Sequence, residues 1–251
     1  MRTKFVSGIA ILLLAVLAYA GDPWKDKTYD QWTQADVENV MFHSPWAQMV
    51  QVETSWKKGV MSSDMNRVGS ERAPGGAGGV GGTAQAATGD PNNPSGVASS
   101  RTMGPMTTFV VRWSSALVER QALTRNAVLT GQMTQADAEK ALAEPENDFQ
   151  VYVGGQDMTP FQSATEDSLK ASTFLKLKKS KDKIAPSKVE LFREGDKVVA
   201  VLFSFPKKGP SGAPTIGADE KGIQFSCVVM KANIHADFEP QHMVAKQGQD
   251  L

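Results

Sequence analysis

Two short segments of the chain largely alternate between apolar and polar residues, one on each side of a long polar stretch. They are residues 50–56 (VQVETSW) and 109–114 (FVVRWS). A period of two places the apolar side chains on one face, which indicates half-buried strands. The strand within residues 21–68 needs a partner, and the candidates lie beyond the polar stretch. We therefore expect both segments to belong to one domain.

Helix signals flank these two strands. Thr33 and Asp36 match a capping box, apolar residues at helical spacing follow, and a Ser-Pro pair ends the pattern. Ser114 or Ser115 is expected to cap a second helix, which Gly131 ends. A third, shorter helix is predicted over residues 134–142, and residues 165–177 are ambiguous between helix and strand.

The last third of the chain reads mostly as strands. Further strands are predicted over residues 149–153, 189–193, 198–205, 223–230 and 234–238. Together these elements predict a single α+β domain, with an antiparallel sheet of about five to seven strands and two to four helices on one face. Residues 106–243 supply most of it, and the polar tail 244–251 is expected to fray.

The segment 69–105 has a composition of its own. Of its 37 residues, ten are glycine and four are proline. It has almost no large apolar side chain to offset the entropy of ordering its backbone. We predict a long disordered loop within the domain. Its glycines lack the Gly-Lys-Ser/Thr ending of a phosphate-binding loop, so no nucleotide site is expected.

Residues 1–20 carry the pattern of a secretory signal peptide. Arg2 and Lys4 precede an apolar run, and the small residues Ala18 and Ala20 stand where signal peptidase requires them. We predict cleavage after Ala20 and export to the periplasm or the medium. The alternative is an uncleaved anchor, but the run is shorter than the about 20 apolar residues of a membrane span. No other segment is apolar enough to span, so no transmembrane segment is expected in the mature chain.

Charge and cysteine content argue against two classes of function, nucleic-acid binding and cysteine-based catalysis. The chain has 27 basic and 27 acidic residues, and this balance does not support nucleic-acid binding. Its one cysteine, Cys227, lies in an apolar run and is expected to be a buried structural thiol. A nucleophilic role would need a histidine close to it in space.

The usual catalytic motifs are absent from the sequence, which has no Gly-x-Ser-x-Gly, His-Glu-x-x-His or paired Cys-x-x-Cys. The best metal candidate combines His235, Asp237 and Glu239, which strand alternation would place on one face, with the nearby His242. Nitrogen and carboxylate ligands of this kind suit zinc or another divalent ion. The alternative interpretation is the solvated face of an edge strand.

Two pairs of side chains are candidates for ligand or partner binding. Trp24 and Trp32 lie in irregular, polar chain and could form a docking surface, since tryptophan suits partner and sugar surfaces, although it also fills cores. Arg112 and Arg120 could clamp an anion. Their alternative role is structural, in ion pairs with acids such as Glu119.

Three segments together resemble a group of uncharacterised exported bacterial proteins. The segments are Tyr29–Thr33 with Asp36-Val37, then Ser44–Ala47, and Val111–Ala122. The resemblance spans most of the mature chain outside the glycine-rich segment. It implies an exported protein with a single α+β domain, and it brings no activity with it.

These observations lead to one leading hypothesis and two alternatives. The leading hypothesis is an exported cell-envelope protein that binds without catalysis, has no cofactor, and recognises an envelope protein or a polysaccharide. The first alternative is a hydrolase or metal-dependent enzyme that uses His235, Asp237, Glu239 or His242. The second is a structural protein that its long loop spaces from a surface.

Overall fold

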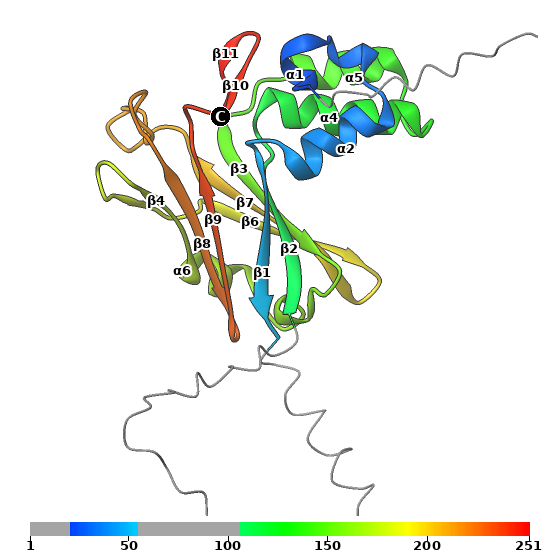
Figure 1. The fold of residues 1–251 in the computed structure, drawn as a ribbon. Coiled ribbons are helices and arrows are strands. Elements are labelled where there is room, and N and C mark those ends of the chain that lie inside the picture. Colours follow the sequence, from blue (N-terminus) through cyan, green and yellow to red (C-terminus); the bar gives the residue numbers. More distant parts are fainter. Residues whose placement is uncertain (1–20, 55–105) are drawn as a thin grey trace, which may run out of the picture.

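The computed structural model describes residues 21–54 and 106–251, and Figure 1 shows their arrangement. The predicted signal peptide and the predicted loop 69–105 lie outside the described residues. The described part has the predicted α+β architecture with antiparallel sheets. Its strands form two larger sheets that face each other, whereas the sequence predicted one sheet.

The first sheet joins the two halves of the chain. Its five strands occur in the order β1-β2-β3-β7-β6, and each neighbouring pair is antiparallel. Val50 of β1 pairs with Phe109 of β2, so the predicted pairing across the glycine-rich segment is confirmed. The strands are β1 (Ala47–Glu53), β2 (Met106–Trp113), β3 (Asp148–Gly155), β6 (Lys188–Glu194) and β7 (Lys197–Pro206).

The second sheet has four strands in the order β5-β4-β8-β9. The ambiguous residues 165–177 divide into helix α6 and strand β4, since Thr165 caps the helix and Thr173 begins the strand. A separate two-stranded hairpin follows near the end of the chain. These strands are β4 (Thr173–Leu177), β5 (Lys183–Ile184), β8 (Ile223–Val229), β9 (Ala232–Phe238), β10 (Val244–Ala245) and β11 (Gly248–Gln249).

Aromatic side chains fill the space between the two sheets. Phe203 and Phe205 of β7 contact Phe225 of β8, with ring centroids 5.4 and 6.5 Å apart. Trp113 of β2 meets Phe238 of β9 at 5.3 Å. All five side chains are buried, and edge-to-face aromatic pairs add about 0.5–1.5 kcal/mol each beyond the burial of their surface. Strands β1 and β9 lie side by side, and α6 contacts β4, β6 and β8, so both long sides of the sandwich are bridged.

The other helices gather at one end of the sandwich, as Figure 1 shows. The predicted capping box is confirmed: Thr33 Oγ1 accepts a hydrogen bond from the Asp36 amide, and Asp36 Oδ2 accepts one from the Thr33 amide. No helix in the described residues is long and apolar enough to cross a membrane. The helices are α1 (Pro23–Asp26), α2 (Gln34–His43), α4 (Leu117–Leu129), α5 (Gln135–Ala143) and α6 (Glu166–Ser172), with 3-10 turns η1 (Tyr29–Gln31) and η3 (Thr159–Phe161).

The tail 244–251 is fixed to the helical end, so the prediction that it frays is wrong. Both carboxylate oxygens of Asp250 accept hydrogen bonds, from the amides of Leu117 and Val118, each at 2.8 Å. Trp46 Nε1 donates to the Asp250 carbonyl oxygen at 2.7 Å. The predicted serine cap is also wrong, because Ala116 stands at the N-cap of α4 and has no capping side chain. The Asp250 carboxylate, which is distant in sequence, accepts the hydrogen bonds that a capping side chain would accept at the start of α4.

Replacing Asp250 with alanine should destabilise the protein by about 1–2 kcal/mol, because two amides at the start of α4 lose their acceptors. Urea unfolding of the two proteins measures the difference. Asp219→Ala is a matched control, since Asp219 is exposed and pairs with Lys179 on the surface. It should change stability by less than about 0.5 kcal/mol. Equal effects of the two substitutions would contradict the assigned cap.

Candidate functional site

The predicted metal ligands are not assembled into a site. His235 and Asp237 project from the exposed face of β9, as the alternation predicted. The strand ends at Phe238, however, and the chain then turns, so Glu239 and His242 contact each other at 3.1 Å, from Oε2 to Nδ1. Asp237 instead pairs with Lys178, the residue after β4. Within residues 21–54 and 106–251, no group of three His, Cys, Asp or Glu side chains could hold a metal ion.

The two tryptophans proposed as a docking surface are buried, and that prediction is wrong. Trp24 and Trp32 are 5% and 1% exposed. The polar chain around them folds into the short elements α1 and η1, which turn both indoles inward. Trp32 Nε1 donates to the carbonyl oxygen of Pro23 at 3.2 Å, and Trp24 packs edge-on against Trp46 with ring centroids 5.5 Å apart. Both residues are core residues of the helical end.

Arg120 holds two helices together. Its Nη2 atom donates to the carbonyl oxygens of Ala141 and Glu144, each at 2.7 Å, and its Nε atom lies 3.5 Å from the Glu146 carboxylate. These carbonyls are at the C-terminal end of α5, where helices leave acceptors unsatisfied and favour positive charge. Arg120 therefore has the structural role and does not form an anion clamp with Arg112.

Cys227 is buried in β8, as predicted. Burial raises the pKa of its thiol to about 11, and a hydrogen bond with Thr173 lowers this pKa by a smaller amount. A thiol of this kind stays protonated and unreactive at neutral pH.

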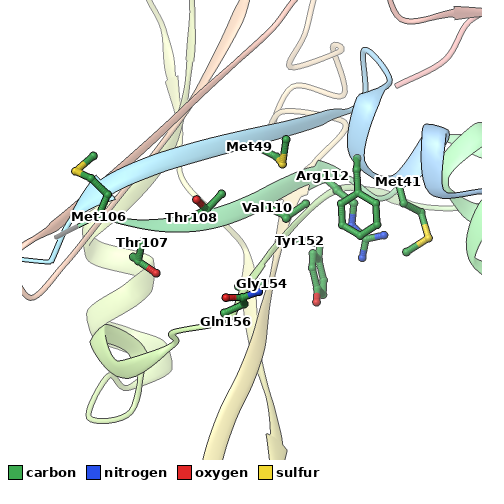
Figure 2. Close-up of a pocket in the computed structure, with 12 residues that line it drawn as sticks. Met41, Met49, Met106, Thr107, Thr108, Val110, Arg112, Tyr152, Gly154 and Gln156 are labelled. Carbon is green, nitrogen blue, oxygen red and sulfur yellow. The ribbon is translucent and has the colours of Figure 1, made fainter.

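A further candidate site is a groove on the outer face of the first sheet. It has a volume of about 570 Å³ and runs along β1, β2 and β3 to the end of α2. In Figure 2, Met106 lies at one end and Met41 at the other, with Arg112 and Tyr152 near the Met41 end. We call this feature the outer groove. It is lined by Met41, Phe42, Met49, Met106, Thr107, Thr108, Val110, Arg112, Tyr152, Gly154, Gly155 and Gln156.

Strand alternation and two glycines build the outer groove. Phe109 and Val111 of β2 point into the sandwich, and Thr108, Val110 and Arg112, which alternate with them, therefore point outward. Gly154 leaves space for the ring of Tyr152, because a Cβ atom there would lie 2.5 Å from the tyrosine Oη atom. At Gly155, a Cβ atom would lie 2.8 Å from the Thr108 carbonyl oxygen. A side chain at Gly154 would fill the floor of the groove, whereas one at Gly155, which pairs with the inward-facing Phe109, would push β2 and β3 apart.

Arg112 is the one charged residue among the described residues that line the outer groove. It is 6% exposed, and its guanidinium carbon lies 4.3 Å from the centre of the Tyr152 ring. Behind it, Nη1 lies 3.6 Å from Oε2 of Glu119, a residue of the first turn of α4 that is fully buried. The partner that the sequence offered for the structural role of Arg112 is thus beside it, although the two atoms are too far apart for a good hydrogen bond.

The environment of Glu119 favours its neutral form. Burial raises the pKa of its carboxyl to about 8, the Arg112 charge lowers this pKa in part, and Asp250 raises it further. Neither Glu119 oxygen, and neither Nε nor Nη1 of Arg112, has a hydrogen-bond partner among the described residues. Near neutral pH the protonated carboxyl therefore leaves the Arg112 charge largely uncompensated.

Sequence reasoning found Arg112 but missed the apolar side chains around it. Met49 and Met106 are at the outward positions of their strands, where the alternation predicts polar residues. Phe42, Met49 and Met106 are 38%, 55% and 40% exposed. A large apolar side chain at an outward strand position is the signal that could have found the groove, and it becomes visible once the register is known.

No protein-family model, no curated protein and no solved structure matches this chain.

Glu119→Gln should change how stability depends on pH. An unfolded glutamate ionises near its ordinary pKa of 4.5, whereas folded Glu119 keeps its proton up to about pH 8. Between these pH values the folded state binds one proton more than the unfolded state, so the free energy of unfolding falls by about 1.4 kcal/mol for each pH unit that the pH rises. Glutamine has no proton to lose. The stability of the variant relative to wild type, measured by urea unfolding, should therefore increase from about pH 5 to about pH 8. A difference that does not vary with pH would show that Glu119 does not titrate in this range.

Proposed function

We propose that the chain is an exported, non-catalytic binding protein and that the outer groove is its binding site. The observation that carries the proposal is the combination in one groove of exposed apolar side chains with a buried guanidinium whose Nε and Nη1 have no hydrogen-bond partner among the described residues. Exposed apolar side chains that line a concave surface are typical of a binding site. The groove volume of about 570 Å³ also falls within the range of about 300–1,000 Å³ that small-molecule sites occupy.

The side chains of the outer groove suit binding better than catalysis. Its described lining contains no His, Asp, Glu, Cys or Lys, the residues that most often transfer protons or act as nucleophiles. The threonine hydroxyls there have no base beside them among the lining residues. The alternative of a hydrolase or metal-dependent enzyme relied on His235, Asp237, Glu239 and His242, which form no group of three that could hold a metal ion in the described part of the chain. The binding hypothesis is therefore the better supported one.

The chemistry of the groove also bears on the kind of ligand. The proposal of an envelope protein or polysaccharide as partner depended on exposed tryptophans, and Trp24 and Trp32 are buried. The groove offers Met41, Met49 and Met106 instead. Methionine is flexible and polarizable, and it adapts its shape to apolar ligands. An apolar or amphipathic ligand is the better match.

A ligand screen on a groove variant tests the proposed function. Met49→Asn removes exposed apolar surface from the groove, and Met230→Asn removes a similarly exposed methionine (59%) from the turn after β8. We expect at least one ligand, from a set of neutral, anionic and cationic amphiphiles, apolar peptides and envelope polysaccharides, to bind wild type and Met230→Asn equally. It should bind Met49→Asn about tenfold more weakly, measured by calorimetry. If no ligand distinguishes the two variants, the groove is not the binding site.

Export is tested by the mass of the processed chain. In a bacterial host with a periplasm, the protein should be recovered outside the cytoplasm with an intact mass that begins at Gly21. Replacing both Ala18 and Ala20 with arginine should block this cleavage, because the shallow peptidase pockets accept small side chains. Full-length wild-type protein retained in the cytoplasm would contradict the proposed export.

A further inference from the structure

The outer groove is apolar along most of its length and cationic near one end. Met106 and Arg112 are six residues apart on β2, which corresponds to about 20 Å along the strand. Met49 and Val110, which face each other across β1 and β2, lie between them. Figure 2 shows this arrangement, with the Arg112 side chain beside Tyr152. A ligand that fits the groove lengthwise has an apolar chain of similar length and one polar end.

The unpartnered donors of Arg112 indicate the charge of that polar end. A guanidinium that is 6% exposed and leaves Nε and Nη1 without acceptors among the described residues carries a desolvation cost. Both atoms are buried and Nη1 faces Glu119, so an anion in the groove would offset this cost mainly through its negative charge. The Tyr152 ring, 4.3 Å away, supports the guanidinium on one side and restricts its orientation.

Because Arg112 is the one cation among the described lining residues, the outer groove favours a ligand with a single negative charge. A carboxylate matches Arg112 in charge and presents two coplanar oxygens to its planar donors. A phosphate monoester carries close to two negative charges at neutral pH. The second charge would find no cation among the described lining residues.

The apolar part of the ligand is better matched by an alkyl chain than by a peptide. A peptide that binds in extended form usually pairs its backbone with a free strand edge. The floor of the outer groove is the face of β2, which is already paired with β1 on one side and β3 on the other. Peptide amides lying on this face would lose water without gaining partners, whereas an alkyl chain has no polar group to satisfy.

We propose that the outer groove binds an alkyl carboxylate of the fatty-acid type, with its carboxylate at Arg112 and its chain along β1 and β2 toward Met106. This inference rests on the proposed function and names the ligand class of the same site. Glu119 contributes from behind: its protonated carboxyl leaves Arg112 free to pair with the ligand.

The first test compares three probes on the mature wild-type protein by calorimetry at neutral pH. Laurate combines the chain and the charge, dodecanol has the chain alone, and acetate has the charge alone. We expect one laurate per chain, dodecanol binding about tenfold more weakly for want of the charge-assisted bond, and no detectable acetate binding. Equal affinity for laurate and dodecanol would overturn the role of Arg112. Binding of several laurates per chain would overturn the single site.

The second test changes the charge of the groove without touching Arg112 or Glu119, whose replacement could disturb folding. Met49 is exposed, so Met49→Lys and Met49→Glu should both fold. Laurate should bind the glutamate variant about tenfold more weakly than the lysine variant, because the new negative charge repels the carboxylate. The control pair Met230→Lys and Met230→Glu should differ by less than about twofold. If the laurate affinities of the two Met49 variants differ by no more than those of the two Met230 variants, the proposal is overturned.

The two tests separate this inference from the proposed function. If laurate fails both tests while another ligand of the screen is sensitive to Met49→Asn, the ligand class is wrong and the binding site remains. If an apolar peptide is that ligand, the argument from the paired strands is wrong as well. If no ligand is sensitive to Met49, both proposals fail.

Discussion

The hydrogen bonds from the first turn of α4 to the Asp250 carboxylate connect most parts of this fold. Asp250 belongs to the segment after the second sheet, α4 belongs to the helical end, and Trp46, which donates to the Asp250 carbonyl oxygen, precedes β1. The same turn carries Glu119 and places it behind Arg112 of β2. The geometry of the outer groove near its charged end therefore depends on a capping interaction between residues more than 130 positions apart.

A buried Arg-Glu pair is a costly arrangement, since desolvation of two charges can exceed their attraction. Here the cost is reduced by protonation, because burial and the nearby Asp250 charge raise the pKa of Glu119 to about 8. A neutral glutamic acid behind the guanidinium keeps it packed against Tyr152 without neutralising its charge. The pair is better suited to presenting a cation to a groove than to stabilising the fold.

Local signals predicted the local structure well. The capping box at Thr33 and the alternation in β2 were confirmed because both depend on residues within a few positions of each other. Long-range contacts were not predictable in the same way. The sequence around Asp250 is polar and looks like a frayed end, because its partners at Leu117 and Val118 lie far away in the chain. Trp24 and Trp32 looked exposed because their polar neighbours concealed two short turns. The groove was missed because Met41 and Met49 come to line one groove with Arg112 only after β1, β2 and α2 are placed together.

The same packing that closes the sandwich confines ligand binding to its outside. A two-sheet protein could hold a ligand between its sheets, but here Trp113 meets Phe238 at 5.3 Å and Phe203 meets Phe225 at 5.4 Å between ring centroids. Interiors packed at this density have no room for a guest without a large cavity cost. The outward face of β1, β2 and β3 has no such filling, because Gly154 and flexible methionines leave it open. A filled interior and an open, methionine-lined exterior place recognition on a surface that the sandwich holds rigid, with Arg112 as its fixed polar point.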